Sequence, residues 1–301
     1  MVQFRRIVVG YNFSPDGEHA LQAVTNLAER EGATLALVHV VDPIPFTYSS
    51  RWSSASSGSL LVEDASRMRA ELTEVAEHRL PRTLPVTIDV PTGRPFVTLI
   101  RSCRSLHGDL IIVGGYPEPA LGYTSLALLR SAPVSVLVAK QAFTSGPKTI
   151  LVPTDFSACS KRAALTALHL VQRFGGRAVF LHVLDTHLFY HAHYRAKLEI
   201  PTLRPEDVEP EWQMFLHDLP LQDLAWEKRT QTGWAAETIS ALAADLGAEL
   251  IVMGTHGQTT THSELTGLTY TLLGSVAETA LQQASVSVLT VRPEAFQFEM
   301  P

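Results

Sequence analysis

The sequence repeats itself once, over a distance close to half of its 301 residues. Ile7-Val8-Val9 recurs as Ile150-Leu151-Val152, and the offset is 150 − 7 = 143 residues. His39-Val40-Val41-Asp42 recurs as His182-Val183-Leu184-Asp185 at the same offset, because 182 − 39 = 143. A repeat of this length is typical of a duplicated domain rather than of a solenoid unit.

Each half alternates short apolar runs with stretches of helical periodicity. The strands expected in the first half are 7–9, 34–40, 87–90, 110–113 and 134–139, and the helices named there are 20–28, 63–80 and 97–106. Five strands alternating with helices predict an α/β domain, with a mainly parallel sheet covered by helices on both faces. A linker at Gln141–Lys148 divides the chain into expected domains 1–141 and 148–293, and the serine-rich stretch Thr47–Ser59 is expected to be a disordered surface loop.

Composition excludes several classes of protein. Hydrophobic residues make up 46% of the chain and charged residues 18%, which is typical of a globular core. A net charge of −6 gives no basic surface for nucleic acid or anionic membrane. No apolar run is long enough for a membrane span, and Cys103 and Cys159 have no metal or redox spacing. We also expect that the N-terminal residues are not a signal peptide. We expect a cytoplasmic protein that binds neither nucleic acid nor membranes.

A strand, a glycine loop and a helix start follow one another in the second half. Leu250–Met253 is typical of a buried parallel strand, Gly254 and Gly257 follow it, and Gly274-Ser275 opens a helical pattern. Glycine lets a ligand approach the main chain, and a helix N-terminus presents free N–H groups and a positive dipole end. The pattern predicts an anion site at the carboxyl end of the sheet. A tight strand-to-helix turn without any ligand remains the alternative.

Taken together, these segments resemble the universal stress protein family, in its tandem form with two copies per chain. The residues that carry the resemblance are Ile150–Ser157, His182-Val183, Val252–Gly257, Gly274–Glu278 and Val286–Arg292. The resemblance implies two flavodoxin-like (adenine nucleotide alpha hydrolase-like) domains and a nucleotide site. It also implies that the last strands, Val134–Ala139 and Val286–Val291, pair across a pseudo-two-fold axis, so that one chain imitates the family's dimer.

The resemblance places the family's nucleotide site on the second half. The implied residues are Pro153, Thr154, Asp155 and Val183 around the adenine, and Met253, Gly254, His256, Gly257, Gly274, Ser275 and Val276 around the phosphates. The implied ligand is ATP or another adenine nucleotide, with or without Mg²⁺. His256 either donates to a phosphate or is a solvated loop residue.

The phosphate loop departs from the family pattern, which has a shorter spacer before its Gly-Ser/Thr element. Here Gln258–Leu273 separates Gly257 from Gly274, and 273 − 257 = 16 residues. The extra residues would form a longer lid or displace the triphosphate, which affects the phosphate end of the site more than the adenine end.

The first half departs further. Asn12 stands where Asp155 stands, Pro117 occupies the place of the second glycine, and Gly122 comes early and is followed by Tyr123. Proline has no N–H group to donate. We therefore expect the first domain not to hold ATP in the family's way, and either to dimerise with the second domain or to bind something else.

Other residues allow further chemistry. His187, His191 and His193 are candidate ligands for zinc or another transition metal, and a polar, aromatic-rich surface segment is the alternative. The sequence has no nucleophile elbow, lysine-bearing P-loop or placed general base, so we expect no enzyme, or at most a slow ATPase. The charged run Arg204–Glu211 is expected to be a solvated helix start, made irregular near Pro210 and Trp212.

Two functions of different class follow. The first is a stress-response regulatory protein that binds ATP or another adenine nucleotide in its C-terminal domain and changes its contacts with protein partners. The alternative is a carrier or interaction protein without a nucleotide, in which Leu188–Tyr190 and Trp212–Leu219 line a pocket for an apolar ligand or partner. A further option is a metal bound by these histidines, either in a carrier or in an ATPase. The whole chain could also form a homodimer.

Overall fold

The structure is a computed structural model, and it describes residues 3–42, 65–116, 121–142, 145–185, 204–256 and 274–293. The expected loop Thr47–Ser59, the histidines His187, His191 and His193, and the loop Gln258–Leu273 lie outside the described residues. None of the described helices is both long enough and apolar enough to cross a membrane.

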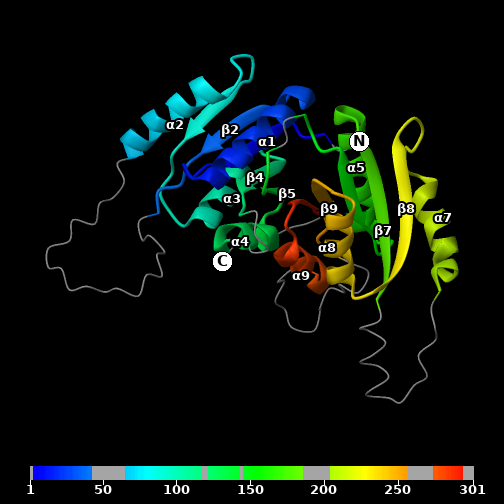
Figure 1. Ribbon diagram of the computed structural model, residues 1–301. Helices are drawn as coiled ribbons and strands as arrows, with labels where there is room; N and C mark the ends of the chain where they lie inside the picture. Colours follow the sequence, from blue (N-terminus) through cyan, green and yellow to red (C-terminus); the bar gives the residue numbers. More distant parts are fainter. Residues whose placement is uncertain are drawn as a thin grey trace, which may run out of the picture.

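Strands and helices alternate through both halves, as expected from the sequence (Figure 1). The first half contains β1 (Arg6–Gly10), α1 (Pro15–Glu31), β2 (Thr34–Val38), α2 (Ala65–Arg79), β3 (Val86–Asp89), α3 (Pro95–Ser105), β4 (Leu110–Gly114), α4 (Tyr123–Ser131) and β5 (Ser135–Ala139). The second half contains β6 (Thr149–Pro153), α5 (Ala158–Phe174), β7 (Arg177–Asp185), the 3₁₀ helix η1 (Pro205–Val208), α7 (Glu209–His217), β8 (Ala225–Gly233), α8 (Ala235–Asp245), β9 (Leu250–Gly254), α9 (Ser275–Gln283) and β10 (Ser287–Val291).

All of these strands belong to one 10-stranded sheet, in the order β3-β2-β1-β4-β5-β10-β9-β6-β7-β8. Within each half the neighbouring strands are parallel. The halves meet at β5 and β10, which pair antiparallel with Leu137 opposite Leu289. The pairing of the two last strands across a pseudo-two-fold axis is therefore confirmed.

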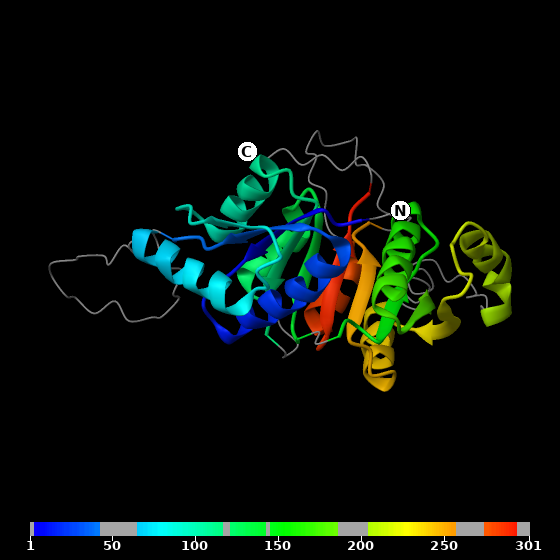
Figure 2. The same cartoon turned by 90° about the horizontal axis from the view of Figure 1, so that it is seen from above.

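Alternation along the strands divides the apolar core into two layers, one on each face of the sheet. In β1, Ile7 and Val9 face the core beneath α1, whereas Val8 faces the opposite core beneath α3. Each core contains residues of both halves: α1, α2, α5 and α7 cover one face, and α3, α4, α8 and α9 cover the other. Figure 2 shows helices of the first half on opposite sides of its strands.

The helices α1 and α5 begin in the same way, because the repeat preserves their first turns. Ser14 Oγ accepts the N–H of Gly17 at 3.3 Å, and Ser157 Oγ accepts the N–H of Ser160 at 3.1 Å. A serine N-cap satisfies one of the free N–H groups at a helix start. Both caps fix the direction in which the chain leaves the carboxyl end of β1 or β6.

Polar contacts also join the halves. His169 Nε2 of α5 lies 2.6 Å from Glu31 Oε1 at the end of α1, and both side chains are buried. Lys140, which follows β5 and is 1% exposed, donates from its Nζ to the carbonyl of Ala284 at 2.5 Å. Because these groups are withdrawn from water, their pairing favours one relative position of the two halves.

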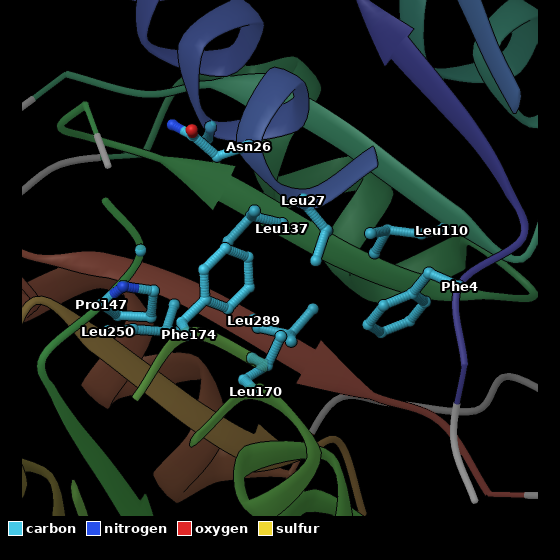
Figure 3. Close-up of a pocket in the computed structure, with 12 residues that line it drawn as sticks. Phe4, Asn26, Leu27, Leu110, Leu137, Pro147, Leu170, Phe174, Leu250 and Leu289 are labelled. Atoms are coloured by element: carbon cyan, nitrogen blue, oxygen red, sulfur yellow. The ribbon is translucent and has the colours of Figure 1, made fainter. Parts of the chain in front are cut away.

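An apolar pocket lies at the junction between α1, α5 and the central strands (Figure 3). Leu27 and Phe4 come from the first half, and Leu170 and Phe174 come from the second. The cavity volume is about 30 Å³, the share of a single water molecule in the liquid. Small-molecule sites typically enclose about 300–1,000 Å³. The junction is therefore a packed interface and not a ligand cavity.

The substitution Leu289→Ala is expected to destabilise the whole chain rather than one half. Leu289 is 2% exposed and lies opposite Leu137 in the strand pair that joins the halves. Loss of its side chain should reduce the free energy of unfolding by about 2–5 kcal/mol. Urea unfolding followed by circular dichroism measures this, with the exposed Met214→Ala on α7 as the control. A Leu289→Ala protein as stable as the Met214→Ala control would contradict the packing described at the junction.

Candidate functional site

The expected site residues of the second half gather at one edge of the sheet. In the order β10-β9-β6-β7-β8, β6 is central, and its neighbours β9 and β7 run parallel to it. Thr154 and Asp155 follow the end of β6, Val183 lies near the end of β7, and Gly254 ends β9. These residues lie at the carboxyl edge of the sheet, where the connections that follow β6 and β9 leave toward opposite sides. Open α/β sheets bind ligands at such a point.

Hydrogen bonds fix the backbone after β6. The N–H of Thr154 donates to the Leu181 carbonyl at 2.8 Å, which extends the pairing with β7 beyond Pro153. Asp155 Oδ1 accepts the N–H of Ser157 at 3.1 Å, as in an Asx turn. The partly exposed carboxylate of Asp155 is thereby held at the start of α5, next to the end of β7.

Phe156 and His182 form an aromatic contact beside Asp155 that sequence reasoning missed. Phe156 has a φ of +64°, an unusual value for a residue with a large side chain. Its ring stacks on His182 at 4.3 Å and meets the edge of the Trp212 ring at 5.0 Å. The Nδ1 of His182 lies 2.8 Å from the carbonyl oxygen of Thr154, so the ring is tied to the chain that carries Asp155.

Burial lowers the pKa of His182. The acceptor carbonyl of Thr154 and the carboxylates of Asp155 and Glu211 act in the opposite direction, but burial is the larger effect. The neutral ring then donates its Nδ1–H to the Thr154 carbonyl. His182 is therefore a positioning group for the β6 terminus.

The phosphate end of the expected site is built from β9 and α9. Met253 is buried, and the N–H of Gly274 donates to the Thr255 carbonyl at 3.0 Å, which joins the start of α9 to the end of β9. Gly274 is the N-cap of α9 and provides no side-chain cap, and the two residues after it, Ser275 and Val276, are exposed. Among the described residues, no side chain caps the first N–H groups of this nine-residue helix.

His256 and Gly257 complete the expected phosphate loop in the sequence. His256 Nδ1 lies 2.7 Å from the hydroxyl oxygen of Thr255, so its ring is oriented by its own neighbour. Gly257 lies outside the described residues. Ten of the eleven expected residues are therefore described, and they lie in the segments that meet at the carboxyl edge of the second half.

The first half repeats the local geometry with different side chains. Phe13 has a φ of +56°, its ring lies 4.9 Å from that of His39, and His39 Nδ1 lies 2.9 Å from the Tyr11 carbonyl oxygen. Phe13 and His39 precede Phe156 and His182 by 143 residues each (156 − 13 and 182 − 39). This recurrence was visible in the sequence and could have identified the aromatic contact.

Gly122, although it comes early in the sequence, lies at the helix start that corresponds to Gly274. It is the N-cap of α4, as Gly274 is of α9, and 274 − 122 = 152 residues is also the offset between the last strands. The short connection of the first half therefore reaches the same helix start. Pro117 lies outside the described residues, and Asn12 Oδ1 accepts the hydroxyl of Ser14 at 2.7 Å.

The segment expected to be irregular combines the 3₁₀ helix η1 with the start of the α-helix α7. Pro210 lies in the first turn of α7, where proline fits without breaking a hydrogen bond, so the irregular part lies before Pro210 and not around Trp212. Trp212 and Phe215 are 1% and 4% exposed and pack in the core against Phe156. These side chains fill the core rather than open a pocket in it, whereas Leu188–Tyr190, the other part of the expected apolar pocket, lies outside the described residues.

Within the described ranges, no three His, Cys, Asp or Glu side chains are grouped as a metal site. The expected metal ligands His187, His191 and His193 fall outside those ranges, so that prediction stays open. Cys103 and Cys159 are buried free cysteines on α3 and α5.

The comparison with protein families decides the identity of the fold. The model of the universal stress protein family matches residues 3–140 and again residues 146–292. The chain belongs to the universal stress protein family. It has the tandem form with two α/β domains, as the resemblance implied, and the family makes it a stress-response protein.

Some relatives match nearly the whole chain, and others match about half of it. A universal stress protein of Mycolicibacterium smegmatis is 26% identical over 311 residues, which cover 95% of this chain and 97% of the relative. A universal stress protein of Methanocaldococcus jannaschii is 32% identical over 149 residues, which cover 48% of this chain and 82% of the relative. The crystal structure of a universal stress protein from Archaeoglobus fulgidus has a TM-score of 0.67 at 18% identity, covering 97% of this chain and 99% of that one, and shows the shared fold.

The substitution His182→Asn is expected to remove part of the pH dependence of stability. Because burial lowers the pKa of the folded ring, the unfolded chain takes up this proton first. The wild-type protein should lose stability as the pH falls through about 6.5, and this loss ends once the folded ring is protonated too. Asparagine keeps an N–H donor for the Thr154 carbonyl and cannot be protonated. Urea unfolding midpoints at pH about 7.5 and about 5 compare the two proteins.

The exposed His78 at the end of α2 supplies the control for this measurement. His78→Asn should leave the pH dependence close to that of the wild-type protein. If His182→Asn also retains the full dependence, the buried neutral state of His182 is wrong.

Proposed function

We propose that the second domain of this universal stress protein binds ATP or another adenine nucleotide, and that nucleotide occupancy regulates its contacts with protein partners in the stress response. The observation that carries the proposal is the meeting of the ends of β6, β7 and β9 with the uncapped N-terminus of α9 at one edge of the sheet. The family resemblance supplies the ligand class.

The residues at the end of β6 fit the adenine part of the ligand. The Asp155 carboxylate is an acceptor, which suits the amino group of adenine. Its Asx turn with Ser157 holds it beside the partly buried Val183, whose side chain offers an apolar surface to a planar base. The positioning contact between His182 and the Thr154 carbonyl keeps this segment in place before any ligand arrives.

The start of α9 fits the phosphate part. Its N-terminus carries about half a positive charge, and no side chain of the described residues caps its first N–H groups. A Cβ atom added at Gly274 would be 3.6 Å from the nearest atom, the Thr255 carbonyl oxygen, so the cap itself is not crowded. Backbone donors and a helix end hold phosphate without a lysine. When bound, Mg²⁺ would supply charge neutralisation to the phosphates.

The substitution Asp155→Ala tests the site. It should weaken ATP binding by about tenfold or more, since a hydrogen bond to a charged group contributes about 1.5–3 kcal/mol. The matched control is Asn12→Ala, at the equivalent position of the first domain, which should leave both the affinity and the stoichiometry unchanged. Isothermal titration with ATP on the full chain measures both quantities.

A single nucleotide per chain, lost with Asp155→Ala and kept with Asn12→Ala, would support the proposal. Equal weakening by both substitutions, or the absence of binding at millimolar ATP in the wild-type protein, would contradict it. Analysis of the released small molecules from freshly purified protein by mass spectrometry then distinguishes a nucleotide from an apolar ligand.

A further inference from the structure

The first domain has a pocket at the carboxyl edge of its own strands. Its volume is about 500 Å³, within the range of about 300–1,000 Å³ that is typical of small-molecule sites. The walls are formed by the ends of β1, β2 and β4 and by the first turns of α1, α3 and α4. Chemically distinctive residues of the wall are Asp16, Asp42, Arg94, Phe96, Tyr116 and Tyr123.

Asp16 is the residue that sets the charge of this wall. It lies in the first turn of α1, is only 9% exposed and lines the pocket. Its carboxylate makes no hydrogen bond or ion pair within the described part of the chain. Gly114 at the end of β4 lies against it, because a Cβ atom added there would be 2.9 Å from the Asp16 Cβ. The Asp16 oxygens are not among the fully buried, unpaired polar atoms, so they remain accessible at the pocket wall, where a cationic ligand would pair with them.

The equivalent position of the second domain is uncharged. Since 16 + 143 = 159, Cys159 stands there, and a Cβ atom added at Gly254 would lie 3.0 Å from its Sγ. The two domains therefore share a contact between the first turn of α1 or α5 and the glycine that ends β4 or β9. Only the first domain places a carboxylate at this contact.

Charges of both signs surround the pocket. The N-termini of α1, α3 and α4 each carry about half a positive charge, and Asp16 complements that of α1 from its own first turn. Arg94 is exposed, so solvent screens its charge. The Asp16 carboxylate carries a full negative charge at the wall and attracts a cation placed beside it. A phosphate group at this place would lie beside a buried carboxylate.

Aromatic side chains give the wall its second property. Phe96 and Tyr123 meet edge to face at 5.8 Å, and both line the pocket, as do Tyr11 and Tyr116. Aromatic faces attract organic cations through their quadrupole and pack on the apolar part of such ligands. A metal ion, in contrast, needs several ligands, and the described residues contain no group of three His, Cys, Asp or Glu suited to one.

We propose that the first domain is a binding site for a small organic amine in its cationic form. The ammonium group pairs with the Asp16 carboxylate, and the carbon skeleton packs against the rings of Phe96 and Tyr123. The site lies in the other domain from the proposed nucleotide site, so the chain is a receptor with two ligands of opposite charge.

The experiment measures binding of three amine probes, phenethylamine, agmatine and spermidine, to the full-length protein by isothermal titration. The neutral isostere 2-phenylethanol tests whether the charge matters. The structure predicts that at least one amine binds, that 2-phenylethanol binds at least about tenfold more weakly than phenethylamine, and that Asp16→Asn weakens the amine by about tenfold or more.

Two controls keep the outcome specific. Glu29→Gln removes a carboxylate from the exposed face of the same helix and should leave amine binding unchanged. The affinity for ATP should be the same in Asp16→Asn and wild-type protein, which separates this proposal from that for the second domain. No binding of any of the three amines at millimolar concentration, equal binding of 2-phenylethanol, or an unchanged amine affinity in Asp16→Asn would each overturn the proposal.

Discussion

The antiparallel pairing of β5 with β10 is the contact through which two parallel half-sheets become one. Leu137 and Leu289 meet there, and the apolar junction beneath them encloses only about 30 Å³. The buried pair Glu31–His169 adds a directional contact between α1 and α5. Tight packing and paired polar groups together allow one relative position of the halves, because a shifted position would leave either a void or an unpaired buried group.

This junction also decides where ligands can bind. Strands of the two halves run in opposite directions across the antiparallel pair, so their carboxyl ends lie at opposite edges of the sheet. The proposed nucleotide site and the pocket around Asp16 therefore lie at opposite ends of the strands, in different halves of the sheet. Coupling between them would have to pass through the shared strands and the helices α1 and α5, both of which contact the central part of the sheet.

The duplication kept the backbone and changed the chemistry. Phe13 with His39 and Phe156 with His182 repeat the same positive φ and the same histidine contact to the carbonyl at a strand end. An unusual backbone conformation of this kind persists only where the surrounding structure holds it. The second residue of the following helix differs in charge between the domains, since Asp16 of α1 corresponds to Cys159 of α5. One scaffold thus places a carboxylate at different positions of the same edge, Asp16 in the first domain and Asp155 in the second.

The amino-acid sequence by itself determined the number of domains, the order of their strands and helices, and the segments that come to the carboxyl edge, because apolar periodicity, glycines and the repeat are local signals. It gave no apolar signal for the edge strand β8, whose residues are mainly polar and none of which is buried. It also did not show that Trp212 packs against Phe156, since this is a long-range contact. Only the tertiary structure brought Asp16 to a pocket wall without a partner, because that depends on which side chains from distant segments surround it.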